Sequence, residues 1–207
     1  MFLIIIYIVL FLMSVLLFYV NNRLFFKYKR YLVRIHLISF VLLLINVVLV
    51  IGFESSFKTF WFNRLALLCF LISGAFIFAI GQGHSKLRDK FYFGFFFFYP
   101  IFTALTMMMD RIFFVLVASP FLWMSITPEI YYHDSNYDIR RVRGIMAPRI
   151  LELVKNGVFL ETRVGMYHGE DIENKAYQNL KIITQNSDSI SVSVDIAGVT
   201  KKITFLK

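Results

Sequence analysis

Long apolar stretches occupy most of the first 128 residues and decide what this chain can fold into. A helix needs about 20 apolar residues to cross the hydrocarbon core of a bilayer. Five stretches approach that length: residues 2–20, 35–53, 65–81, 91–109 and 112–126. Hydrophobic residues make up 58% of the chain, more than a soluble protein of this size can keep from water. The sequence therefore predicts a polytopic helical membrane domain over residues 1–128.

A charged pair separates the fourth and fifth stretches. Residues 91–126 are too long for one crossing, and Asp110 and Arg111 interrupt them. We interpret this region as a helical hairpin with the pair at its tip. Pro100 and Pro120 lie within its two arms, where prolines usually kink a membrane helix.

The distribution of Lys and Arg predicts the orientation, because cytoplasmic loops are the richer in positive charge. The loops after the first and third stretches are strongly basic, whereas the loop after the second carries only Lys58 and Arg64 beside Glu54. The segment after the fifth stretch carries four arginines: Arg140, Arg141, Arg143 and Arg149. This alternation predicts five crossings of a bacterial inner membrane, with the amino terminus outside and the C-terminal region in the cytoplasm.

The interiors of the five stretches contain no Asp, Glu, Lys or Arg. Ion-coupled transporters place such groups inside the membrane, so this absence weighs against that class. Asn46 and Ser73 are the polar residues that we expect to support packing between helices, and His36 lies near the start of the second stretch. The small residues Ser73-Gly74-Ala75 predict a close approach of two helices.

The composition changes after Pro128. We interpret residues 129–138 as a juxtamembrane linker and residues 139–207 as a small antiparallel β-rich domain. Within residues 189–196, Ile and Val alternate strictly with Ser and Asp, as in a strand with one buried face. Together with residues 180–185 and 199–206, and a tight turn at Ala197-Gly198, this predicts a three-stranded meander.

Residues 150–164 allow two interpretations. Asn156-Gly157 suits a type I′ turn between two strands, which would place Glu152 opposite Glu161, a mildly unfavourable pair. Alternatively, Pro148 begins a short helix that Gly157 caps. We favour the hairpin.

The chain ends directly on a predicted strand that contains Ile203 and Phe205. A domain of this size rarely has a sufficient core of its own, and an edge strand pairs readily with another chain. We therefore expect a homo- or hetero-oligomer, with this edge as a candidate pairing site.

Motifs for chemistry are missing from the sequence. Cys69 is the single cysteine, the four histidines are scattered, and no phosphate-binding loop or nucleophile motif occurs. We expect no catalytic site, cofactor, metal site or nucleic-acid partner. The four arginines named above are the candidates for contact with anionic lipids or with a partner.

The sequence thus predicts a non-enzymatic scaffold subunit of an inner-membrane assembly, whose cytoplasmic β domain docks partners. This layout of five spans and a β-rich cytoplasmic end resembles the TssN family, an inner-membrane subunit of a variant type VI secretion system. The resemblance implies oligomerisation and contact with other secretion subunits. Two alternatives stay open: a ligand-gated membrane effector whose β domain binds a small signal through arginines, and a small-molecule transporter.

Overall fold

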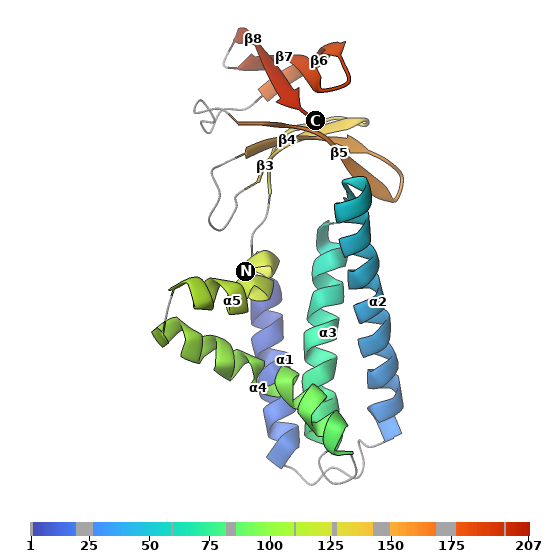
Figure 1. The fold of residues 1–207 in the computed structure, drawn as a ribbon, viewed down its shortest axis with the longest axis vertical. Coiled ribbons are helices and arrows are strands. Elements are labelled where there is room, and N and C mark those ends of the chain that lie inside the picture. Colours follow the sequence, from blue (N-terminus) through green and yellow to red (C-terminus); the bar gives the residue numbers. More distant parts are fainter. Residues whose placement is uncertain are drawn as a thin grey trace. The chain divides into compact units, whose positions relative to one another are not determined.

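The computed structural model describes residues 2–19, 27–58, 60–81, 86–109, 111–125, 128–142, 150–168, 177–196 and 198–207. Within these ranges, five helices precede an antiparallel β half-barrel, and one further short strand lies between the second and third helices. The chain divides into two compact units (Figure 1). One unit comprises Met1–Ile45 and Phe60–Ser125, and the other Asn46–Thr59 and Ile126–Lys207.

The helices follow the apolar stretches of the sequence. Their bounds are α1 Phe2–Tyr19, α2 Lys29–Phe53, α3 Phe60–Gly81, α4 Leu87–Met109 and α5 Arg111–Ser125. The predicted separation of the fourth and fifth stretches is confirmed as two helices, while Asp110 itself lies outside the described residues. Among the described residues, three helices are long and apolar enough to cross a membrane: Phe2–Tyr19, Lys29–Phe53 and Trp61–Gly81.

Small residues of α3 bring it close to α4. A Cβ atom added at Gly74 would lie 2.5 Å from the Phe96 ring. Ala75 is fully buried and packs with Phe97. The close approach predicted from Ser73-Gly74-Ala75 is therefore present between these two helices.

The β domain is an eight-stranded antiparallel sheet in the order β2-β3-β4-β5-β8-β7-β6, with β1 paired to β5. Its strands are β1 Ser55–Phe57, β2 Glu129–His133, β3 Tyr137–Val142, β4 Ile150–Asn156, β5 Leu160–Tyr167, β6 Tyr177–Gln185, β7 Ser189–Ile196 and β8 Val199–Leu206. Strands β6 to β8 form one layer and β3 to β5 another (Figure 1). Apolar side chains from both layers meet in one core, which includes Leu151, Leu153, Ile190, Val192 and Phe205.

The predicted meander is confirmed, because β6, β7 and β8 pair consecutively. Ile196 pairs with Val199, and Gly198 has a φ of +82°, a conformation that a glycine adopts without steric cost. The predicted β4–β5 hairpin is confirmed as well, so the alternative of a helix capped by Gly157 is wrong.

The position of the β4–β5 turn differs from the prediction. Gly157 donates its N–H to the carbonyl of Leu160, so Val158 and Phe159 form the tip. A type I′ turn needs positive φ at both central residues, and neither Asn156 nor Gly157 has it. The register shifts accordingly: Glu161 pairs with Asn156 and Glu152 with Met166, so the two glutamates are not directly opposed.

The segment predicted as a linker is part of the sheet. Residues 129–133 form β2, and residues 137–142 form β3, which pairs with β4 along its whole length. Tyr131, Tyr132 and Tyr137 pack against the core. Tyrosines combine a polar hydroxyl with a large apolar ring, so a sequence that looks polar contributes strands.

β1 requires the largest correction. Five crossings would place the connection between the second and third stretches on the opposite side of the membrane from the C-terminal domain. In the structure, Ser55, Ser56 and Phe57 of that connection pair with Thr162, Glu161 and Leu160 of β5. Two strands of one sheet cannot lie on opposite sides of a bilayer, because backbone hydrogen bonds join them directly. The arrangement of five complete crossings is therefore incompatible with this sheet.

Candidate functional site at the junction of β1 and β5

The two faces of β3, β4 and β5 differ sharply in chemistry. Side chains alternate along a strand, and the register places Ile139, Leu151 and Leu153 on the face toward the core. The opposite face carries the charged side chains Asp138, Arg140, Glu152, Glu161 and Arg163. This charged face is the candidate site.

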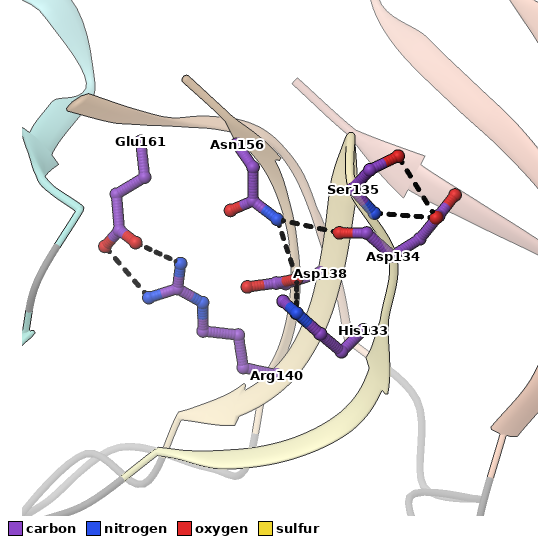
Figure 2. A network of polar contacts seen from close by, with 7 residues as sticks. All are labelled: His133, Asp134, Ser135, Asp138, Arg140, Asn156 and Glu161. Carbon is purple, nitrogen blue, oxygen red and sulfur yellow. Dashed lines mark hydrogen bonds and ion pairs between the residues drawn. The ribbon is translucent and has the colours of Figure 1, made fainter. Parts of the chain in front are cut away.

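Arg140 and Glu161 form a buried, two-pronged ion pair, drawn in Figure 2. The Nη1 atom of Arg140 donates to Oε1 of Glu161 at 2.9 Å, and Nη2 donates to Oε2. Their side chains are only 10% and 11% exposed. Burial alone lowers the pKa of the Arg140 guanidinium, but hydrogen bonding to Glu161 and its negative charge outweigh burial, so the pKa is raised. Arg140 is therefore a permanent cation here.

β1 connects to this pair through a serine. The Ser56 hydroxyl donates to Oε1 of Glu161 at 2.9 Å. The Glu161 carboxylate thus accepts from a strand on each side of β5, namely from Arg140 of β3 across the sheet and from Ser56 of β1.

Arg163 bridges two further carboxylates. Its guanidinium lies 3.2 Å from Glu54, which directly precedes β1, and 4.0 Å from Glu152 of β4. Burial raises the pKa of Glu152, and this exceeds the opposing effects of Arg163 and Arg140. Glu54 and Ser56 therefore both fasten this connection to the charged face, the first just before β1 and the second within it.

A cavity of about 150 Å³ lies within this cluster. It is lined by the end of α2 at Val50, by Ser55 and Ser56 of β1, and by the charged side chains of the sheet. The Nε atom of Arg140 is buried and has no hydrogen-bond partner within the described part of the chain. Ligand pockets usually measure about 300 Å³ or more, so this cavity suits water or a small ion.

A second polar cluster caps the end of β2, β3 and β4, as Figure 2 shows. Asp138 accepts from His133 at 2.7 Å and from Asn156 at 2.8 Å, and Asn156 also donates to the carbonyl of Asp134. These bonds hold the β2–β3 turn against β4. Among the residues that the structure describes, no three His, Cys, Asp or Glu side chains are close enough together to hold a metal ion.

The four predicted arginine contacts lie in different surroundings. Arg141 points to the face opposite Arg140, is 1% exposed, and pairs with Glu129 at 2.6 Å. Arg140 and Arg141 are therefore held in ion pairs rather than presented on an open surface. Arg143 and Arg149 lie outside the described residues. Contact of the four with lipids or a partner stays a prediction.

The two polar residues predicted for helix packing, Ser73 and Asn46, differ in their surroundings. The Ser73 hydroxyl of α3 lies 3.1 Å from Nδ1 of His36 in α2, and Nε2 of His36 lies 2.9 Å from the Tyr92 hydroxyl of α4. Asn46 is buried, and its Oδ1 has no hydrogen-bond partner among the residues that the structure describes.

The predicted edge residues Ile203 and Phe205 point into the core, where Phe205 is fully buried. The sequence predicts β8 at the end of the sheet, but in the structure β8 lies between β7 and β5. Its pairing with β5 is nevertheless limited to Met166 and Leu206.

Glu54, Ser56 and Arg163 were not predicted from the sequence as members of the charged cluster. β1 contains three residues, too few for an alternating pattern to be recognised. The sequence offered one signal for this cluster, the predicted pairing of Glu152 with Glu161 across the hairpin. That pairing assumed a register of β4 and β5 that the structure does not have.

Comparison with known proteins adds no assignment, because no family model, curated protein or solved structure matches this chain. Fold and site together define a class: a chain of apolar helices followed by an antiparallel β half-barrel, with one strand supplied by the connection between two helices.

Proposed function

We propose that this protein is a non-enzymatic, membrane-anchored subunit of a larger assembly, in which the helices hold the chain in the bilayer and the β domain docks a partner protein or a second copy. The single observation that carries the docking proposal is the incomplete seam between β5 and β8. β8 has eight residues, but only Leu206 has a ladder partner in β5. A strand edge of this kind is a template for an added strand.

The backbone group to block is the N–H of Thr204. Backbone groups of an antiparallel strand point alternately to its two neighbours. Leu206 bonds toward β5, so Thr204, two residues before it, directs its N–H to the same side. Its hydroxyl lies 3.0 Å from Ser191 on β7.

The test is affinity purification of the full-length protein in mild detergent, with mass spectrometry and a measurement of oligomeric mass. Thr204→Pro removes the outward N–H, and we expect it to abolish a stoichiometric partner or a higher oligomer. Thr204→Ala loses the bond to Ser191 but keeps the N–H, and is expected to retain the complex. A monomer without partners, or equal behaviour of both variants, contradicts docking at this edge.

We further propose that the chain crosses the membrane an even number of times. β1 and the strands after residue 128 belong to one sheet, so the segment between them must begin and end on the same side. α3 is a candidate span, and α4 and α5 then make one net crossing together. With α1 and α2 this gives four crossings, and both termini lie on the same side.

The charge of the loops supports an extracytoplasmic β domain. The two connections on the other side, together with the starts of α2 and α4, carry most of the basic residues near the helices: Arg23, Lys27, Lys29, Arg30, Arg34, Lys86, Arg88 and Lys90. Arg140 and Arg141 lie in ion pairs within a folded domain, and folded domains cross largely regardless of their charge. The cytoplasmic location expected above depended on five crossings, as did the resemblance to TssN.

Alkaline phosphatase fused after Lys207 tests the orientation, because it folds to an active form only outside the cytoplasm. We expect activity, and we expect green fluorescent protein at the same position to stay dark when exported by the general secretory pathway. An inactive phosphatase and a fluorescent green fluorescent protein would place the β domain in the cytoplasm, and the number of crossings would still be even.

A second candidate function is a ligand-responsive membrane effector. One observation favours it: the 150 Å³ cavity is lined jointly by the end of α2, by β1 and by the sheet, so an occupant would contact the connection between two helices. It predicts growth inhibition on overexpression that Arg163→Gln relieves. Equal toxicity of both proteins, or none, would count against this function.

A further inference from the structure

An apolar tip projects from the β4–β5 hairpin. Val158 is 83% exposed and Phe159 is 81% exposed, and Leu160 beside them is 36% exposed. Hairpin tips are ordinarily built from Gly, Asn, Asp, Ser and Pro. A contiguous exposed apolar group therefore indicates contact with something other than water.

The tip is tied directly to β1. Lys58 donates its backbone N–H to the carbonyl of Phe159 at 3.0 Å, and Phe57 pairs with Leu160. These direct bonds hold the tip next to the connection between α2 and α3.

That connection is short and is flanked by candidate membrane spans. α2 ends at Phe53, two residues before β1, and the apolar span of α3 begins at Trp61, three residues after Lys58. Three extended residues reach at most about 10 Å. Each interfacial layer of a bilayer is about 5–8 Å deep, so Lys58 and the tip lie at or next to the headgroups when the two helices span the membrane.

The chemistry around the tip matches this depth. Phe53 and Trp61 are 66% and 52% exposed, and aromatic side chains collect at the boundary between lipid and water. Lys58 is exposed, as a cation beside lipid phosphates would be.

We propose that Val158 and Phe159 insert into the bilayer interface and form a second, hairpin-borne membrane contact for the β domain. This inference depends on the membrane anchoring proposed above. It assigns the occupant of the exposed tip as phospholipid, and it explains why a turn in a β domain is built from a valine and a phenylalanine.

The test uses the full-length protein reconstituted into phosphatidylcholine–phosphatidylglycerol vesicles. In a Cys69→Ala background, Phe159→Cys carries a small fluorophore, and Val199→Cys is the matched control. Val199 is an apolar residue that is 61% exposed and is the first residue of β8, in the hairpin between β7 and β8. This hairpin is not the one that pairs with β1. We expect lipids with brominated chains to quench the fluorophore at residue 159 at least threefold more strongly than at residue 199, and aqueous iodide to show the reverse preference.

Native tryptophan fluorescence in the same vesicles separates the two proposals. If the brominated lipids quench the tryptophans but not the label at residue 159, the tip proposal is wrong and the anchor stands. If they quench neither, the membrane anchor itself fails. Equal lipid quenching at residues 159 and 199 also overturns the tip proposal, because it would show no specific contact.

Discussion

The Ser55 hydroxyl lies 3.0 Å from the Thr162 hydroxyl, although the two residues are 107 positions apart in the chain. Ser55 belongs to the connection between α2 and α3, and Thr162 is the third residue of β5, near the tip of the β4–β5 hairpin. This contact places a loop between two apolar helices inside the sheet of the C-terminal domain. The contact is incompatible with five complete crossings, and it supports the proposed membrane contact of the hairpin tip.

The first prediction is that Ser55→Cys with Thr162→Cys forms a disulfide. Side-chain oxygens 3.0 Å apart are replaced by sulfurs at paired positions of adjacent strands, where Cβ atoms come within bonding range. With Cys69→Ala, we expect the crosslink to form in cells without added oxidant when the domain is extracytoplasmic, since the periplasm is oxidising. The readout is faster migration on a non-reducing gel.

Each single-cysteine variant is the control for that crosslink and should not shift. A crosslink that appears only after an oxidant is added places the pair in the cytoplasm. No crosslink under either condition would contradict the β1–β5 pairing itself.

The second prediction concerns the buried ion pair. Arg140→Met should destabilise the β domain by about 3–5 kcal/mol, because it leaves the Glu161 carboxylate buried without its partner. Arg140→Met with Glu161→Leu should recover most of this loss, since a well-packed apolar pair replaces a buried ion pair at little cost. Thermal unfolding of the purified protein in detergent measures both. A double variant that is no more stable than Arg140→Met would contradict the assignment.

The third prediction is a pH dependence at Glu152. Burial raises its folded-state pKa above the ordinary value of 4.5. At a pH between 4.5 and the folded-state pKa, the folded state binds more protons than the unfolded state. The contribution of Glu152 to stability therefore falls as the pH rises through the folded-state pKa. Glu152→Gln should therefore be more stable than the native protein at neutral pH, by up to about 1 kcal/mol, with the difference shrinking as the pH falls toward 4.5. Unfolding midpoints across this range provide the measurement; a difference that grows on acidification would refute it.

The fourth prediction tests the seam between β5 and β8. A Cβ atom at Gly165 would lie 2.8 Å from Cβ of Phe205 and 3.0 Å from the Leu206 carbonyl oxygen. Gly165→Ala should therefore separate the strands and cost about 1–3 kcal/mol of domain stability. Gly52→Ala is the matched control, because nothing lies within 4 Å of its added Cβ. We expect that control to be neutral or stabilising.

Residues 189–206 were predictable because local rules decide them. Strict alternation gives the register of β7 and β8, and a glycine at the turn is compatible with a positive φ. The β4–β5 turn was misplaced by two residues, because Asn-Gly is a strong local signal that the pairing of Asn156 with Glu161 overrides. Hydropathy similarly located the helices, and a charged pair marked the break between α4 and α5.

The charged face could not be predicted as a cluster. Its members come from the connection after α2, from β3, from β4 and from β5, and each alone is an ordinary charged residue. Only the register of four strands decides that Arg140, Glu161 and Arg163 share a face. Two of the arginines that were interpreted as a topology signal, Arg140 and Arg141, instead pair with the carboxylates of Glu161 and Glu129 on other strands.

The sequence by itself determined the apolar helices, the antiparallel character of the C-terminal domain and its meander, since hydropathy and side-chain periodicity act over a few neighbouring residues. Only the tertiary structure decided that a three-residue strand between two helices completes that sheet. The reason is physical: a backbone ladder three residues long leaves no pattern in its own sequence, yet it forms when a distant strand offers matching hydrogen-bond partners.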